Sequence, residues 1–355
     1  MNRLSALVVS AAVLALLSGC APGSPTPLTS TSPESGTPSP AETVEAGEHP
    51  VPGFGDGCAA LVPMSLITAI SPDANTPHDM LATEYAAFPS IPQHAAIAQA
   101  GGLLCEWSNG EPYTSQMGTS GFRGIQLSVL PDAAQGWITF TDYYGLDPAV
   151  GQVYCSGSDF YCGFDFFESG YWFNAEAFVS ETPGTLENVQ ALVDHLRRQA
   201  LAFGAAAEPW MPAGHVVVPN DCAIILPGSV VDEVFGAGHS LDENDGGGGW
   251  SIWAEGFLRN SDTGCGWFNE TQSIGTSWLN GGAWLAAELG ATDGSPLPLD
   301  GLASDDSATI TCDAAGCDVT LIVAGNWFDV NATGSPDDSS AATRLASHLV
   351  DVVRG

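Results

Sequence analysis

The sequence contains no lysine and only seven arginines, against 41 aspartate and glutamate residues. The formal net charge is −34 at pH 7, although charged residues make up only 14% of the chain. A protein with so few basic residues cannot neutralise the phosphates of a nucleic acid or the headgroups of an anionic membrane. We therefore predict no nucleic-acid partner. We interpret the acidity as a solvated surface that keeps the protein soluble, rather than as a dedicated cation-binding surface.

Several sequence motifs of enzymes are also missing. A Walker loop requires lysine, and the G-x-S-x-G motif of serine hydrolases does not occur. No C-x-x-C pair is present, and no apolar run beyond the N-terminus is long enough to cross a membrane. We therefore predict a non-enzymatic protein without cofactor or metal. The alternative is an envelope hydrolase whose site assembles from scattered Asp, Glu and Ser residues.

The N-terminus has the pattern of a bacterial export signal. Arg3 precedes the apolar run Leu4–Leu17, which is short for a membrane span. The run ends in Leu17-Ser18-Gly19-Cys20, which resembles the lipobox of bacterial lipoproteins. This resemblance implies that residues 1–19 are a signal peptide and that the Cys20 thiol carries the lipid. Several acyl chains at one residue would give durable anchoring.

The segment 20–55 is rich in Pro, Ser, Thr, Gly and Glu and has few large apolar residues. Such a composition buries too little surface to offset the entropy of ordering the chain. We predict a disordered tether that holds the folded part on the outer face of the cell membrane, with the membrane contacted through lipid on Cys20.

The remaining sequence contains an internal duplication. In chain order the matched positions are Cys58 and Cys222, Cys105-Glu106-Trp107 and Cys265-Gly266-Trp267, Cys155/Cys162 and Cys312/Cys317, Trp172 and Trp327, and His195 and His348. The spacing from Cys162 to Trp172 in the first half equals the spacing from Cys317 to Trp327 in the second half. We therefore predict two repeats, 56–205 and 221–355, joined by a linker at 206–220.

The pattern within each repeat predicts an α+β fold. Terminal helices are expected at 186–203 and 341–353, where apolar residues recur at helical spacing, and short helices at 63–70 and 227–235. Middle helices are expected around Trp137 and Trp284. Strands are expected at 103–107, 124–130, 264–268 and 273–279. The prediction is two duplicated domains, each an antiparallel sheet with packed helices and two disulfides.

The Cys-led helix, the central C-x-W and the later Cys before an aromatic strand resemble the small actinobacterial lipoprotein domains of family DUF3558. Both repeats fit this pattern, so the resemblance covers most of residues 56–355. The extra cysteine in each half departs from it. The resemblance implies a compact domain of an envelope lipoprotein and assigns no catalytic residue.

Eight cysteines remain when Cys20 is set aside, four in each repeat. An even number in an exported chain favours disulfides over a metal cluster. The two late cysteines of each repeat are close in sequence, which suits a disulfide across a hairpin. The two early cysteines of each repeat are then left to pair with each other. The predicted bonds are Cys58–Cys105, Cys155–Cys162, Cys222–Cys265 and Cys312–Cys317. Crossed pairing between early and late cysteines stays open.

Two further features resemble functional sites. Asp242–Gly246 begins like a calcium loop but fails the EF-hand pattern, because Gly246 and Trp253 occupy ligand positions. We interpret 242–249 as a flexible acidic loop, and cation binding there stays open. His195 and His348 are interpreted as packing residues rather than catalytic bases, since a base duplicated at equivalent positions would be unusual.

Some tryptophans lack a counterpart in the other repeat and are candidates for an exposed surface: Trp210, Trp250, Trp253 and Trp278. Of these, Trp250 and Trp253 are suited to stacking against a sugar. The leading hypothesis is a lipid-anchored, tandem binding or scaffolding module of the cell envelope, with a protein or glycan partner.

Overall fold

The computed structural model describes residues 50, 54, 57–78, 80–81, 91–111, 121–156, 161–179, 185–203, 209–242, 250–260, 263–288, 294–314, 316–334 and 338–355. Cys20, the signal peptide and most of the tether lie outside the described residues, as does the acidic loop after Asp242. Within these ranges, no helix is both long and apolar enough to span a bilayer.

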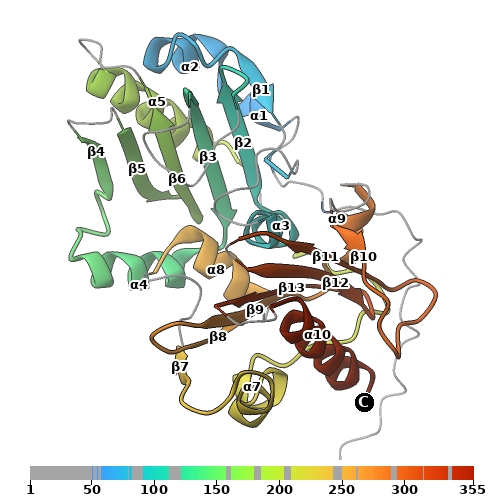
Figure 1. The fold of residues 1–355 in the computed structure, drawn as a ribbon. Helices are drawn as coiled ribbons and strands as arrows, with labels where there is room; N and C mark the ends of the chain where they lie inside the picture. Colours follow the sequence, from blue (N-terminus) through green and yellow to red (C-terminus); the bar gives the residue numbers. More distant parts are fainter. Residues whose placement is uncertain are drawn as a thin grey trace, which may run out of the picture. The chain divides into compact units, whose positions relative to one another are not determined.

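The first repeat contains a six-stranded antiparallel sheet, here called sheet 1, with the strand order β1-β2-β3-β6-β5-β4. Its strands are β1 (Thr76–His78), β2 (Leu103–Ser108), β3 (Gly124–Pro131), β4 (Gln152–Ser156), β5 (Tyr161–Glu168) and β6 (Tyr171–Phe178). Figure 1 shows the strands of sheet 1 in blue-green to green.

The second repeat contains a seven-stranded antiparallel sheet, sheet 2, with the order β10-β11-β12-β13-β9-β8-β7. Its strands are β7 (Ser240–Asp242), β8 (Thr263–Phe268), β9 (Ser273–Leu279), β10 (Ser295–Pro296), β11 (Ser307–Cys312), β12 (Cys317–Val323) and β13 (Asn326–Thr333). Counted from β7, this order repeats that of sheet 1, with β10 added at the far edge. The predicted α+β fold with two antiparallel sheets is therefore confirmed.

The strand registers also agree between the two halves. The partners are Ile125 for Trp107, Ile274 for Trp267, Leu130 for Trp172 and Leu279 for Trp327. Each matched tryptophan thus lies on the same strand of its sheet and opposite the same type of residue. This agreement fixes which positions of the two sheets are equivalent.

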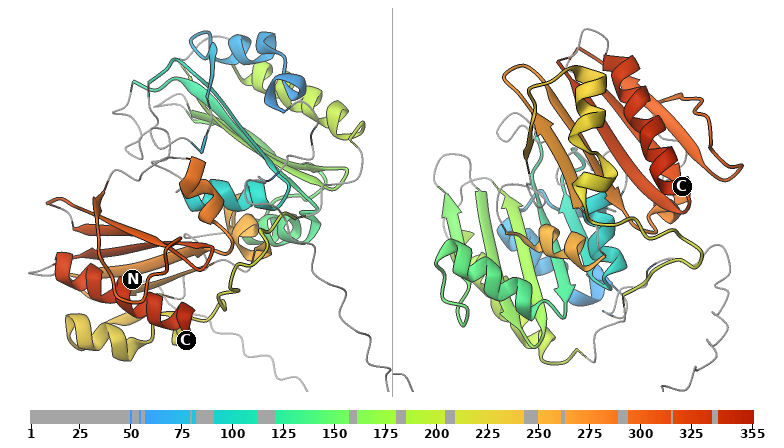
Figure 2. Two further views of the ribbon diagram at one scale, coloured as in Figure 1. Left: turned by 90° about the vertical axis from the view of Figure 1, so that its right-hand side faces the viewer. Right: turned by 90° about the horizontal axis from the view of Figure 1, so that it is seen from below.

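One face of each sheet is covered by helices (Figure 2). Sheet 1 carries α1 (Cys58–Leu61), α2 (Met64–Ile70) and α5 (Thr185–Ala200), and sheet 2 carries α6 (Cys222–Ile225), α7 (Gly228–Phe235) and α10 (Asp338–Arg354). In α5 the buried residues Val189, Leu192, Val193 and Leu196 follow helical spacing, so one stripe of the helix meets the sheet. We call this side of each sheet the first face and the opposite side the second face.

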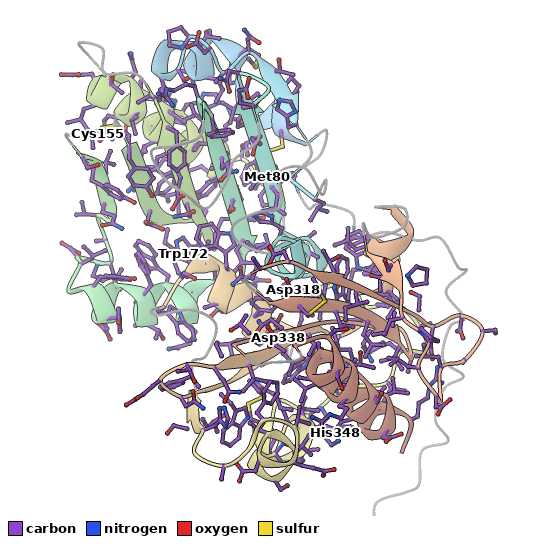
Figure 3. All side chains as sticks on the ribbon, in the orientation of Figure 1. Met80, Cys155, Trp172, Asp318, Asp338 and His348 are labelled. Atoms are coloured by element: carbon purple, nitrogen blue, oxygen red, sulfur yellow. A yellow bond between two sulfur atoms is a disulfide. The ribbon has the colours of Figure 1, made fainter. Side chains whose placement is uncertain are left out.

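The second faces are covered by helices, and two of these helices pack across against the sheet of the other repeat. The helices are α3 (Ile91–Gln99) and α4 (Ala134–Tyr144) from the first repeat, and α8 (Ile252–Arg259) and α9 (Ala283–Glu288) from the second. Ile252 of α8 packs with α4 against Leu130 and Trp172 of sheet 1. Reciprocally, α3 packs against Leu279 and Trp327 of sheet 2. Figure 3 labels Trp172 at this end of sheet 1.

Helices α3 and α8 lie directly against each other (Figure 1). A Cβ atom on Gly256 would lie 3.0 Å from Cγ1 of Ile97, so glycine permits this close approach. Buried hydrogen bonds add to the contact: Asn260 Nδ2 donates to the Ala96 carbonyl over 2.8 Å, and Gln99 Nε2 donates to the Asn280 carbonyl over 2.9 Å. Both repeats therefore belong to one packed unit, Thr43–Gly355.

The four predicted disulfides are present. Cys58–Cys105 joins α1 to β2, and Cys222–Cys265 joins α6 to β8. Cys155–Cys162 and Cys312–Cys317 each link the two strands of a hairpin, where the cysteines are register partners. No disulfide joins an early to a late cysteine, so crossed pairing is excluded.

Candidate functional site

The second face of sheet 1 carries polar side chains where a sheet core usually carries apolar ones. One row crosses four strands and contains Ser128, Asn174, Asp165 and Gln152. The next row crosses all six strands and contains His78, Glu106, Gln126, Glu176, Gly163 and Tyr154. Register partners point to the same side of a sheet, so both rows share one face.

Burial raises the pKa of three carboxyl groups in these rows. Glu106 is 1% exposed and Asp165 is 4% exposed. Desolvation raises the pKa of Glu106 to about 7 and that of Asp165 to about 6, and it also raises the pKa of Glu176. Carboxyl groups with raised pKa values on one surface are typical of functional sites.

Asp165, on β5, is held in place by three neutral donors from the two neighbouring strands, β4 and β6. Its Oδ1 accepts from Asn174 Nδ2 over 2.9 Å and from Trp172 Nε1 over 3.3 Å. Its Oδ2 accepts from Gln152 Nε2 over 2.9 Å. These hydrogen bonds favour the ionised carboxylate, but the cost of burial is larger, so the pKa remains raised. Asp165 is therefore a fixed carboxylate without a cationic partner among its hydrogen-bond donors.

Glu176 is linked to a pair of tyrosines. The hydroxyls of Tyr154 and Tyr161 lie 3.2 Å apart, and the Tyr161 hydroxyl hydrogen-bonds Glu176, which lowers the pKa of that carboxyl against the larger effect of burial. Glycine at position 163 makes room for this arrangement, because a Cβ atom there would lie 2.7 Å from Cζ of Tyr154. The network connects β4, β5 and β6.

A cavity of about 350 Å³ opens onto these groups. We call it the carboxylate–aromatic pocket. Its polar lining includes Gln152, Asp165, Asn174 and Glu176, and its aromatic lining consists of Phe140, Tyr144, Tyr154, Trp250 and Trp253. The residues found to line it include no arginine and no histidine.

The wall formed by Trp250 and Trp253 is positioned by α8. Ser251 caps this helix, and its Oγ accepts from the Ala254 N–H over 3.1 Å. The cap places Trp250 just before the helix and Trp253 in its first turn. At the other end of α8, Arg259 donates to the carbonyls of Pro131 and Asp132 on the first repeat. The second repeat thereby supplies a fixed wall to a site on the first.

The equivalent face of sheet 2 has different chemistry. Register places Thr320 where sheet 1 has Asp165, and Asp329 where it has Asn174. Asp329 accepts from Trp327 Nε1 over 2.9 Å, and burial raises its pKa to about 6. At the positions of Tyr154 and Glu176, however, sheet 2 has Thr311 and Asn331. Among the described residues, sheet 2 thus lacks the combination of two acids and a tyrosine that Asp165, Glu176 and Tyr154 form on sheet 1.

The structure places the tryptophans singled out from the sequence in different settings. Trp250 and Trp253 line the pocket, whereas Trp210 packs edge-on against Trp284 with ring centroids 6.0 Å apart. Trp278, a candidate for an exposed surface, is instead fully buried. It packs beside Phe328 in the core of sheet 2, an apolar environment that its lack of a counterpart in sheet 1 could not reveal.

The two histidines lie outside the pocket lining. His195 on α5 has its Nε2 3.0 Å from the Leu61 carbonyl, and His348 lies on α10 (Figure 3). No group of three or more metal-ligating side chains occurs within the described ranges. The sequence reasoning missed Glu106, Asp165 and Glu176. The signal that would have found them is the strand register, which brings distant polar residues onto one face.

Comparisons with protein-family models, curated proteins and solved structures found no match to this chain. The resemblance to actinobacterial lipoprotein domains therefore stays a prediction. The functional argument rests on the geometry of the carboxylate–aromatic pocket.

Proposed function

We propose that this protein is an extracytoplasmic binding protein that holds a small polar ligand in the carboxylate–aromatic pocket. The four disulfides fit an oxidising compartment outside the cytoplasm. The lipobox-like sequence at Cys20 and the composition of the tether support attachment to the outer face of the membrane by lipid.

The observation that carries the proposal is the pocket itself. Its volume of about 350 Å³ is in the range of small-molecule sites. Aromatic side chains with a few converging polar groups are the usual lining of such sites. The polar groups come from β4, β5 and β6 and are held by hydrogen bonds before any ligand is present. A preformed lining of this kind reduces the entropy cost of binding.

A second candidate function is hydrolysis of a glycoside. Asp165 and Glu176 lie on adjacent strands at diagonal positions, where Cα atoms are about 7–8 Å apart. Paired carboxyl groups, one of them with a raised pKa, are the usual acid and base of glycosidases. Binding is the better supported function, because three side-chain donors already occupy both oxygens of Asp165, which leaves that carboxyl committed to the sheet rather than free for a substrate proton.

The proposal is tested with the full lipidated protein in nanodiscs and ligand-observed NMR against a panel of small metabolites and saccharides. We expect Trp253→Ala and Glu176→Gln each to weaken binding of a hit about tenfold. Asp318→Asn is the matched control, since this acid lies on sheet 2 at the position equivalent to Gly163. Hits that bind all three variants like the wild type would overturn the proposal. Release of a product from a bound glycoside would instead establish the second candidate.

A further inference from the structure

We propose that the ligand of the carboxylate–aromatic pocket is an organic ammonium cation. This inference rests on the proposed function and specifies the ligand class. It is carried by the combination of two acidic side chains, several aromatic rings and no basic side chain around one cavity.

The charges of the pocket are hydrogen-bonded but not neutralised. Asp165 accepts from an amide on each side and from an indole, all of them neutral donors. Glu176 is hydrogen-bonded by the hydroxyl of Tyr161, which is also neutral. Partly desolvated carboxylates without a counter-charge are costly, and a bound cation would remove that cost.

The walls of the pocket fit a cation that also carries hydrocarbon. Five aromatic side chains line it, and the face of an aromatic ring attracts an ammonium group, most strongly for tryptophan. A bare metal ion would require several oxygen ligands around one point. Among the described residues, no group of three or more His, Cys, Asp or Glu side chains could hold one.

The neutral alternative, a saccharide, is less favoured. Trp250 and Trp253 could stack against a sugar ring, and Gln152 and Asn174 could bond its hydroxyls. Both amides, however, already donate to Asp165, and a sugar would leave the two carboxylates without a counter-charge. The net charge of −34 would in addition raise the concentration of cations near the protein and lower that of anions.

The experiment compares ammonium probes with neutral molecules of the same shape. Choline is paired with 3,3-dimethylbutan-1-ol, in which carbon replaces the charged nitrogen, and phenethylamine is paired with 2-phenylethanol, in which a hydroxyl replaces the ammonium group. Binding to the full lipidated protein is measured by calorimetry and NMR. We expect the cations to bind at least about tenfold more tightly than their neutral partners.

Variants locate the binding in this pocket. Glu176→Gln should weaken binding of choline about tenfold, and Trp253→Ala by a similar factor, whereas Trp253→Phe retains an aromatic ring and should restore part of the affinity. Asp318→Asn should leave binding unchanged. Disulfide mapping of each variant reports whether it has folded.

The pH dependence provides an independent readout. The titratable groups at the pocket are Asp165 and Glu176 with Tyr144 from α4, Tyr154 from β4 and Tyr161 from β5, and the pocket residues 250–253 carry no charge. Affinity for choline should therefore rise between pH 5 and pH 7.5, as the carboxyl groups ionise. Affinity for a neutral ligand should stay nearly constant.

The outcomes separate the two proposals. If neutral isosteres or saccharides bind as tightly as the cations and depend on Trp253, the ammonium inference is wrong and the binding function stands. If no probe of either class shows binding that depends on Trp253, both proposals fall.

Discussion

Trp172 and Asp165 form a buried hydrogen bond between adjacent strands, with the indole Nε1 3.3 Å from the carboxylate Oδ1. Sheet 2 preserves the bond but not the position of its acceptor. The equivalent Trp327 donates to Asp329, two residues along the same strand, over 2.9 Å. In both repeats the second face thus places a carboxylate beside the buried indole, which satisfies the indole N–H.

The first prediction concerns this bond. Trp172→Phe removes a donor from a buried carboxylate and should reduce the free energy of unfolding by about 2–4 kcal/mol, of which the lost hydrogen bond accounts for about half. Trp327→Phe is the matched change in sheet 2 and should cost a similar amount. Urea denaturation followed by circular dichroism measures both. A loss below about 0.5 kcal/mol in either variant would show that the bond does not stabilise the fold.

The second prediction is that the protein becomes more stable as the pH falls from 7.5 to 5. Burial raises the folded-state pKa of Asp165 and Asp329 to about 6 and that of Glu106 to about 7, whereas the unfolded chain has values near 4. Each group therefore contributes stability below pH 4 that is lost as the pH rises through 6 to 7.

Thermal melts across this pH range test the prediction. Glu106→Gln should flatten the dependence between pH 6 and pH 7.5. The exposed residue Glu111 supplies the control, since Glu111→Gln changes the net charge equally. A steeper or unchanged profile in Glu106→Gln would contradict the assignment.

The third prediction ranks the disulfides. Cys58–Cys105 closes a loop with a sequence separation of 47, and Cys155–Cys162 one with a separation of 7. In the chain-entropy model the long bond contributes about 4 kcal/mol and the short bond about 2.5 kcal/mol. Replacing each pair by alanines should therefore lower the unfolding midpoint more for the long bond. Equal losses would indicate that strain or residual structure in the unfolded chain dominates.

The fourth prediction is that Gln99 couples the two repeats. Its Nε2 donates to the Asn280 carbonyl, and its Oε1 accepts from Trp284 Nε1 over 3.1 Å. Gln99→Ala removes both bonds in a buried environment and should cost about 2 kcal/mol, with a broader unfolding transition. Gln190→Ala, at an exposed position on α5, is the control. A transition as sharp as that of the wild type would show that other contacts suffice.

The fifth prediction concerns the anchor. Cys20→Ser should leave the precursor unprocessed or release the protein from the membrane fraction, because serine cannot carry the thioether-linked lipid. Mass spectrometry and fractionation of cells measure this. A Cys20→Ser variant that is lipid-modified and membrane-bound like the wild type would refute the lipoprotein assignment.

The elements with a strong periodic pattern could be predicted from the sequence. The terminal helix expected at 186–203 is α5, Thr185–Ala200, and the strand expected at 273–279 is β9. Both succeed because each element buries one side only, so its apolar residues recur with its own period. The duplication then extended each prediction to the other repeat.

The helices expected around Trp137 and Trp284 are α4 and α9, but α3 and α8, which pack across to the other repeat, could not be predicted in this way. In α3 the polar residues His94 and Gln99 are both fully buried, because the helix is enclosed by α8 and by parts of both sheets. A helix buried on several sides shows no polar stripe. Its role depends on contacts with residues far along the chain, which local periodicity does not record.

The candidate site was missed for a related reason. Asp165 lies within the aromatic segment Phe164–Phe167. A single acid in such a segment is typical of the solvent-facing side of a half-exposed strand, so the sequence does not predict its burial. Only the pairing of β5 with β6 shows that it shares a buried face with Glu176. Trp250 and Trp253 were found, because tryptophan beside a glycine-rich loop is conspicuous in any sequence.

The reciprocal packing of α3 and α8 has a consequence for how the site could diversify. Two separate copies of one repeat would have to meet as a homodimer to cover their second faces, and any substitution would then appear twice. In the fused chain each copy varies independently. The first copy can keep its acids and tyrosines while the second contributes Trp250 and Trp253 and carries Thr311 and Asn331 at the equivalent positions, an asymmetry that a symmetric homodimer cannot have.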